Sequence, residues 1–260
     1  MSPVAQSLHR TSIPLDICFQ VIDYVDYEFP IMYRRPTLGA CALACSAWLP
    51  RARRHLYRSV WLSEPEEYKL FARTIAGSPS LGALVKELRC DVDMDDEVWD
   101  DAAVADALLP NRAARNLTGL RYLGIMSNYH ICVHPGVFKF VSNCARAKSV
   151  TTLAISEFLT LSPEDIIHML KHFPHIQEFC LDTQISLDEF GAHALTDLPP
   201  DFCRNLTKLT LADLQVDAPY LAVMPDHITT LQLGRYYPLR GPEDPEDTHV
   251  FKLLQSVAAD

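Results

Sequence analysis

The chain has 260 residues and a formal net charge of −10 at pH 7. A negatively charged surface repels phosphate, so this charge argues against a nucleic acid as the main partner. Hydrophobic residues make up 48% of the chain and charged residues 22%, a composition typical of a globular protein with a sizeable buried core.

The N-terminus and the cysteines indicate an intracellular protein. Residues 1–11 lack the apolar core of a signal peptide, and the longest run of apolar and small residues, 38–49, is too short to cross a bilayer. Eight cysteines stand at wide and irregular spacings, so we expect reduced thiols that pack as small hydrophobic groups. We therefore expect a soluble protein of the cytoplasm, the nucleus or both.

Residues 13–62 predict a helical domain that follows a flexible segment, residues 1–12. Pro14 suits the first turn of a helix, and apolar residues recur around it at helical spacing. These residues are Ile13, Ile17, Val21, Ile22 and Val25. We then expect a loop over 26–36, a second helix over 38–48 that Pro50 ends or kinks, a short helical segment over 51–57 and a strand over 60–62.

Between residues 85 and 233 one strand-like pattern occurs six times. It consists of an apolar residue, two variable residues, an apolar residue, one variable residue and a further apolar residue. The middle apolar residues lie 22 to 35 residues apart, at Leu88, Leu123, Leu153, Phe179, Leu209 and Leu231. Six copies in order indicate an internal repeat whose units stack into a solenoid, because no single unit can bury its apolar face alone.

Helix-like segments separate these strands, with start signals at Ser63 and Glu66 and at Ser162 and Pro163. The repetition of strand, turn and helix predicts an α/β fold that resembles a leucine-rich-repeat solenoid over residues 63–239. Its parallel strands would form the concave side and its helices the convex side. The Asn or Cys usual after such strands occurs only at Asn128, so we expect an irregular array. Residues 240–260 predict an acidic, proline-rich linker and a terminal helix.

The variable positions of the strands predict a binding surface. Side chains between the buried positions of a strand point to the opposite face, which is the concave one here. We expect them to bind a protein substrate, with Tyr122 and Met126 as anchors because of their residue type. The full set is Glu87, Arg89, Tyr122, Met126, Thr152, Glu178, Asp182, Lys208, Thr210, Thr230 and Gln232.

Residues 13–62 resemble the F-box. The family opens on Leu-Pro, one residue, an acid, and Leu or Ile, and this chain has Ile13-Pro14-Leu15-Asp16-Ile17. An apolar pair follows at Val21-Ile22, and the second half of the motif falls on Leu38, Ala44-Cys45 and Trp48. The longer loop after residue 26 and the segment after Trp48 are similar to the expanded fungal sets of this family.

The resemblance implies a three-helix module that docks on a Skp-type adaptor and, through it, on a cullin and a RING protein. A module of about fifty residues buries little surface by itself, and an exposed apolar stripe marks an interaction surface. The adaptor-binding residues that the resemblance implies are Ile13, Pro14, Leu15, Ile17, Val21, Ile22, Leu38, Leu43 and Trp48.

Three other patterns favour ordinary structural explanations. His168, His172, His175 and Cys180 could suggest zinc, but Met169 stands where a zinc protease needs Glu, so solvent-facing histidines are favoured. The aspartates at 91, 93 and 95 lack the glycine and the final Glu of a calcium loop. The basic cluster over 51–58 is typical of a solvated helix face. We expect neither a metal nor a cofactor.

The chain shows no phosphate-binding glycine-rich loop and no nucleophile elbow, so we expect a protein without catalytic activity. The resemblance implies the substrate-recognition subunit of an SCF-type ubiquitin ligase. The first alternative is a repeat scaffold whose F-box does not join a cullin complex. The second is a cryptic enzyme, which would need a deep pocket with perturbed titratable groups.

Overall fold

The computed structural model describes residues 14–28, 31–92, 109–127, 135–156, 163–182, 203–212 and 228–233. It divides into two compact units, residues 1–58 and 59–260, termed here the helical unit and the repeat unit. The predicted segments 1–12 and 240–260 lie outside the described residues, as does Asn128. The domain boundaries inferred from the sequence stay predictions.

The helical unit contains α1 (Leu15–Glu28), α2 (Ile31–Ala44) and α3 (Leu49–Arg58). Ile22 and Val25 of α1, Leu38 of α2 and Ala52 of α3 form its buried core. Partly buried apolar side chains, including Trp48, pack around these four residues. All three helices therefore contribute to one small core.

The prolines of this unit do not break its helices where the sequence pattern suggested. The predicted loop over 26–36 is wrong, because α1 continues to Glu28 and α2 begins at Ile31 with Pro36 inside it. A proline that close to a helix start removes only one backbone hydrogen bond, the one from its own missing N–H. The predicted second helix also ends before Trp48, and Pro50 lies in the first turn of α3, where proline suits a helix.

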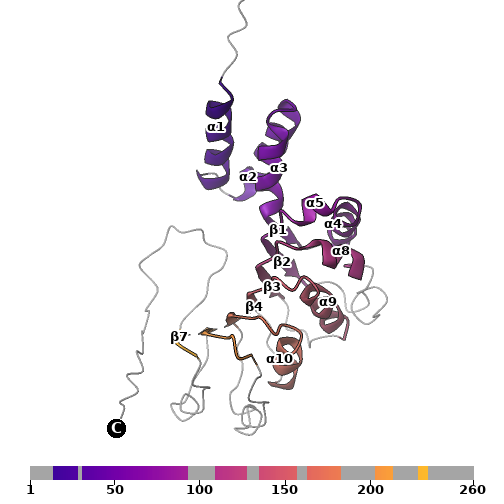
Figure 1. Cartoon of the computed structure of the whole chain (residues 1–260), viewed down its shortest axis with the longest axis vertical. Helices are drawn as coiled ribbons and strands as arrows, with labels where there is room; N and C mark the ends of the chain where they lie inside the picture. Colours follow the sequence, from indigo (N-terminus) through magenta and orange to yellow (C-terminus); the bar gives the residue numbers. More distant parts are fainter. Residues whose placement is uncertain are drawn as a thin grey trace, which may run out of the picture. The chain divides into compact units, whose positions relative to one another are not determined.

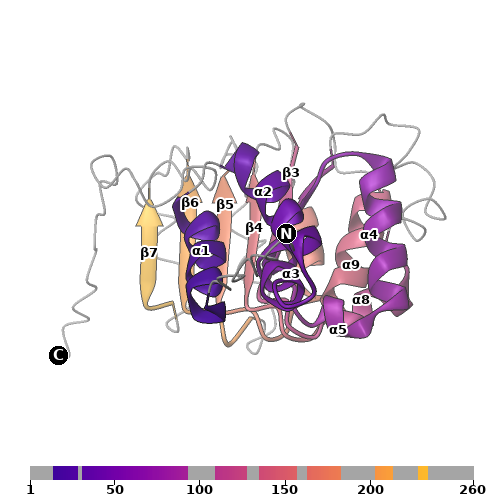
Figure 2. The ribbon, with the colours of Figure 1, turned by 90° about the horizontal axis from the view of Figure 1, so that it is seen from above.

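The repeat unit contains one parallel sheet of seven strands in sequential order. The strands are β1 (Ser59–Leu62), β2 (Glu87–Asp91), β3 (Tyr122–Met126), β4 (Thr152–Ser156), β5 (Glu178–Asp182), β6 (Lys208–Ala212) and β7 (Thr230–Leu233). Figure 2 shows β3 to β7 side by side. Every copy of the sequence pattern forms a strand, and so does the segment predicted over 60–62, so the predicted parallel α/β repeat architecture is confirmed.

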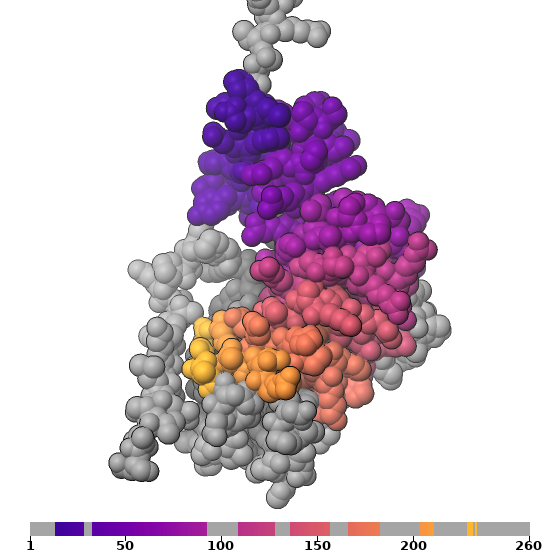
Figure 3. All heavy atoms as spheres, in the orientation of Figure 1, coloured from indigo at the N-terminus to yellow at the C-terminus, as the bar shows by residue number. Residues whose placement is uncertain are grey.

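Helices of the repeat unit lie together on one side of the sheet (Figure 1). They are α4 (Pro65–Gly77), α5 (Pro79–Gly82), α8 (Asn111–Asn116), α9 (Pro135–Ala145) and α10 (Pro163–Leu170). The colours in Figure 3 change in bands along this unit, as expected when each repeat packs on its sequence neighbours.

The helices α4 and α9 and the segment from α10 to Phe173 bury residues at the same spacing. Each places buried side chains at positions i, i+3, i+4 and i+7, one face of a helix. The sets are Tyr68, Phe71, Ala72 and Ile75; Val137, Phe140, Val141 and Cys144; and Ile166, Met169, Leu170 and Phe173. Beneath them lie the apolar strand positions, of which Leu88, Leu123 and Leu153 are fully buried neighbours in register. The repeats therefore share one continuous core.

The start of α4 differs from the prediction by one residue. The predicted capping box of Ser63 and Glu66 is wrong, since the N-cap is Glu64 and the reciprocal partner is Glu67. One carboxylate oxygen of Glu67 accepts hydrogen bonds from the backbone N–H and the hydroxyl of Ser63, at 2.8 and 3.2 Å. Pro65 takes the first helical position, which moves the cap to the residue before it.

One side chain links the first repeats. Tyr68 of α4 is fully buried, and its hydroxyl donates to the backbone carbonyl of Asp91 at 2.9 Å and lies 3.3 Å from that of Leu62. Its ring meets the edge of Phe140 on α9, with 5.6 Å between the centroids. Tyr68 thus joins the ends of β1 and β2 to α9, the helix between β3 and β4.

We predict that Tyr68→Phe lowers the free energy of unfolding by about 1–2 kcal/mol, because the carbonyl of Asp91 loses a buried donor. Urea unfolding followed by circular dichroism measures the difference. Ser80→Ala, which removes an exposed hydroxyl from the same unit, is the control and should change little. Equal stability of Tyr68→Phe and the parent chain would contradict this role of the hydroxyl.

The cysteines that the structure describes are all free thiols, and most are buried, as the sequence predicted. Burial raises the pKa of Cys90 and that of Cys144 well above the usual value, because the thiolate would lose its hydration. Cys45, in contrast, is exposed at the end of α2. Cys45 is therefore much more accessible than Cys90 and Cys144.

Among the cysteines that the structure describes, alkylation of the native chain should modify Cys45 first, while Cys90 and Cys144 react only after unfolding. Iodoacetamide labelling followed by peptide mass spectrometry measures each site separately, and labelling in urea is the positive control. Labelling of Cys90 in the native chain at the rate of Cys45 would refute this order.

Candidate functional site

The first helix carries two neighbouring apolar stripes. Cys18, Ile22 and Val25 form the buried stripe. The residues one position earlier, Ile17, Val21 and Tyr24, are 44%, 49% and 58% exposed. Since both stripes follow the same i, i+4, i+7 spacing, α1 presents a continuous apolar face of which only half is used by the core. Exposed large apolar residues that lie together mark an interaction surface.

The structure separates the predicted adaptor-binding residues into two groups. Pro14, Leu15, Ile17, Val21 and Leu43 are exposed and available to a partner. Ile22 and Leu38 are 0% and 1% exposed in the core of the helical unit, and Trp48 is half-buried against that core. In this conformation Ile22 and Leu38 hold the three helices together and cannot touch a partner. Ile13 lies outside the described residues.

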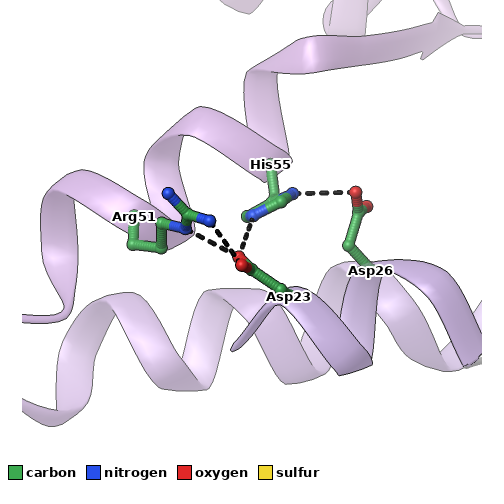
Figure 4. A network of polar contacts seen from close by, with 4 residues as sticks. All are labelled: Asp23, Asp26, Arg51 and His55. Carbon is green, nitrogen blue, oxygen red and sulfur yellow. Dashed lines mark hydrogen bonds and ion pairs between the residues drawn. The ribbon is translucent and has the colours of Figure 1, made fainter. Parts of the chain in front are cut away.

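A polar network ties α1 to α3 (Figure 4). The carboxylate of Asp23 accepts two hydrogen bonds from the guanidinium of Arg51, one of them from Nε at 2.6 Å. The two ring nitrogens of His55 lie 2.8 Å from carboxylate oxygens of Asp23 and Asp26. Carboxylates only accept, so both contacts are hydrogen bonds at the same time only when the imidazole carries both protons. The network fixes the orientation of α1 and therefore of its exposed stripe.

The hydrogen bonds of this network lower the pKa of Asp23. The hydrogen bonds from Arg51 have the largest effect, burial opposes them and His55 adds to them, and together they lower the pKa of Asp23 from its usual 3.8 to about 2. Arg51 also lies over the ring of Phe19, 5.9 Å from its centroid. The basic cluster of the sequence is thus not uniform: Arg51 is engaged with α1, whereas Arg53, Arg54 and Arg58 are exposed.

In the repeat unit, the strand register collects the predicted substrate-binding residues into three rows. The first row is Ser59, Glu87, Tyr122, Thr152, Glu178, Lys208 and Thr230. The second is Trp61, Arg89, Gly124, Ala154, Cys180, Thr210 and Gln232, and the third is Asp91, Met126, Ser156, Asp182 and Ala212. All eleven predicted residues therefore lie on one face of the sheet, opposite the helices.

These residues differ in how much they can offer a partner. Tyr122 is half-buried, and the guanidinium of Arg89 lies over its ring, 5.4 Å from the centroid. The ring also covers Gly124, where a Cβ atom would come within 3.1 Å of it. Met126 and Thr210, at 6% and 2% exposure, are buried. Of the two expected anchors, only Tyr122 keeps an accessible surface.

Charged side chains on this face pair along the first two rows. Glu87 and Arg89 form an ion pair on β2 at 3.8 Å, and Glu178 on β5 pairs with Lys208 on β6 at 3.6 Å. Trp61 stands in register with Arg89 and adds an aromatic side chain at the β1 end. The sequence prediction missed Trp61 because it assigned that strand to the helical domain, although the strand signal itself was visible.

Two histidines that suggested a zinc site pack on one another and on an aromatic ring. His168 and His172 pack edge to face with 5.3 Å between their centroids, and Phe138 packs on His168. Within the described part of the chain, no three His, Cys, Asp or Glu side chains come together as a metal site requires. The aspartates at 93 and 95 lie outside it. No helix of that part is long and apolar enough to cross a membrane.

We predict that the stability contributed by Asp23 is present above about pH 4 and is lost as the pH falls towards 2. The sign follows from its lowered pKa, because the unfolded chain binds the proton first and acid therefore favours unfolding. The difference in unfolding free energy between the parent chain and Asp23→Asn should narrow over this range in urea titrations. Glu28→Gln, an exposed position at the end of α1, is the control. A difference that does not change with pH would contradict the assignment.

The sequence matches no protein-family model and no curated protein. Among solved structures, the chain is similar to the leucine-rich repeat-containing protein LegL7 from Legionella pneumophila. The alignment has 15% sequence identity and a TM-score of 0.47, and covers 76% of this chain and 63% of that chain. The chain thus spans less than two thirds of the length of LegL7, and this likeness alone assigns neither a family nor a function.

Proposed function

We propose that this chain is a substrate-recognition subunit of an SCF-type ubiquitin ligase. In this proposal the helical unit docks on a Skp-type adaptor, and the repeat unit holds a protein substrate. The chain itself catalyses nothing and needs no cofactor. It acts by keeping the substrate close to the charged ubiquitin-conjugating enzyme, which raises the effective concentration of the reacting groups.

One observation carries the docking half of the proposal. The positions that resemble the F-box motif include Leu15, Ile17 and Val21, and these three side chains are exposed although they are large and apolar. Their neighbours on the same helix fill the core, so folding of the unit does not explain them. An adaptor that covers them would remove apolar surface from water at about 25 cal/mol per Å².

The second half of the proposal rests on the open face of the sheet. Its rows combine an aromatic side chain under a guanidinium, Tyr122 and Arg89, with charged pairs farther along. Tyr and Arg are enriched among the residues that dominate protein interfaces. A face built from several parallel strands also suits an extended or folded protein partner better than a small substrate.

The docking proposal is tested by co-expressing the full chain with a Skp-type adaptor and measuring the affinity of the purified pair. Replacing Ile17 and Val21 together by Ala should weaken binding about tenfold or more, since each truncated contact in an interface core costs about 1–2 kcal/mol. Leu70→Ala is the matched control, because Leu70 is an equally exposed leucine on α4. The proposal is refuted if the adaptor does not bind the parent chain. It is also refuted if the adaptor binds the double variant as tightly as it binds Leu70→Ala.

The main alternative is an interaction scaffold that does not join a cullin complex. The same preparation separates the two once a cullin and its RING partner are added. Co-migration of all components in gel filtration supports the ligase subunit. An adaptor complex that excludes the cullin supports the scaffold.

A further inference from the structure

A pocket of about 470 Å³ lies where two neighbouring repeats meet. Its walls come from the last turn of α9 and from the segments that follow α9 and α10. Val150, Phe173 and Pro174 supply apolar surface, and Ser142 supplies a hydroxyl. The volume falls within the range of about 300–1,000 Å³ that is typical of small-ligand pockets.

The polar lining of this pocket is basic. Arg146, Lys148, His172 and His175 border it, and among the described residues no carboxylate does. No residue of the described chain forms an ion pair with any of these four side chains. Two permanent cations and two imidazoles are thus gathered on a chain whose formal net charge is −10. With no acidic partner among the described residues, these side chains give the pocket a net positive charge.

Helix capping does not supply that explanation. The last carbonyls of α9 already accept backbone N–H groups: Asn143 from Arg146 at 3.1 Å, and Ala145 from Lys148 at 3.2 Å. After α10, Met169 accepts from His172 at 3.1 Å and Leu170 from Phe173 at 2.9 Å. The cationic side chains are therefore not needed to satisfy these groups. Each helix end carries about −0.5 charge, so two ends together do not neutralise the two permanent cations.

The backbone at one of these cations is strained. Lys148 has a φ of 35°, in the left-handed region that glycine or asparagine normally fills. A lysine there is less favourable than in an ordinary conformation, because its Cβ crowds the backbone. Residues held in this way concentrate at ligand sites, where the surrounding structure maintains them. Lys148 follows the end of α9, where left-handed residues are common, so this conformation fixes the place of the lysine at the pocket and the argument for a ligand rests on the charge.

We propose that this pocket, termed here the basic pocket, binds a phosphate monoester. A phosphate monoester is largely a dianion at neutral pH, so it suits a site with two permanent cations. The guanidinium of Arg146 can donate two parallel hydrogen bonds to its oxygens, and Lys148 contributes a point charge. Exposed Pro174 offers apolar contact to the part of the ligand next to the phosphate.

The same chemistry is found on a phosphorylated side chain of a protein partner and on a free small molecule such as a mononucleotide. The proposal concerns the repeat unit only and does not depend on adaptor docking. It therefore stands or falls separately from the ligase function.

The titration of His172 can report whether an anion is bound in the basic pocket. Burial, and then repulsion from His168, lowers the pKa of His172 from its usual 6.5. A bound dianion favours the protonated imidazole, so it should raise this pKa again. His168 of α10, which itself contacts Phe138, packs on the ring, and Arg146, Lys148 and His175 line the same pocket. An NMR titration of the His172 ring with and without phosphate measures the effect directly.

Calorimetry measures the binding of four probes to the full chain. They are inorganic phosphate, a phosphotyrosine peptide, the same peptide without phosphate, and adenosine monophosphate. We expect saturable binding of the phosphate-bearing probes only. The double variant Arg146→Gln with Lys148→Asn should weaken it tenfold or more, and asparagine tolerates the left-handed backbone, so folding is preserved. Lys171→Gln, a neighbouring exposed lysine outside the pocket, should bind like the parent chain.

Preference for the phosphopeptide would identify a modified protein as the source of the phosphate, and preference for the nucleotide a small molecule. Both results support the proposal. It is overturned if no phosphate-bearing probe binds saturably, if the double variant binds like the parent chain, or if the His172 titration does not move with phosphate.

Discussion

Every other feature of the repeat unit depends on the stacking of one strand on the next. A single repeat can neither pair the backbone of its strand nor bury its apolar positions. At the starts of β2 to β6, one carbonyl accepts two consecutive N–H groups at the start of the following strand, as Arg121 does from Thr151 and Thr152. The same arrangement recurs at Thr151, which accepts from Gln177 and Glu178. A shift by one residue would turn every apolar side chain to the wrong face, so the apolar pattern and the ladder maintain the same register.

This register creates two different surfaces. Alternation along the strands puts the polar rows on the face opposite the helices, where Tyr122 and Arg89 lie together. Stacking also brings the ends of neighbouring helices side by side, and there Arg146 and His172 border one pocket although they are far apart in sequence. The two surfaces lie on different sides of the same repeats. A partner on the sheet face and a phosphate in the basic pocket would therefore not compete for the same residues.

The helical unit is organised by a different constraint, the width of the apolar face on α1. The core needs only the stripe of Cys18, Ile22 and Val25, and the adjacent stripe stays exposed. Asp23 of α1 faces α3, where Arg51 and His55 form hydrogen bonds with its carboxylate. These polar contacts keep α1 in a fixed orientation without covering Ile17 and Val21. A surface that is both apolar and held rigid suits docking, because little conformational freedom remains to be lost on binding.

The sequence by itself determined the seven strands, the repetition of strand and helix, and the side of the sheet on which each strand residue lies. These are consequences of local periodicity, and a period of two or of 3.6 residues is visible in any single segment. Only the tertiary structure decided that Ile22, Leu38, Met126 and Thr210 are buried, that Pro36 lies inside a helix, and that Arg51 meets Asp23. It alone also gathered the cations of the basic pocket. Burial and pairing depend on which distant segment lies opposite a residue, and no local pattern carries that information.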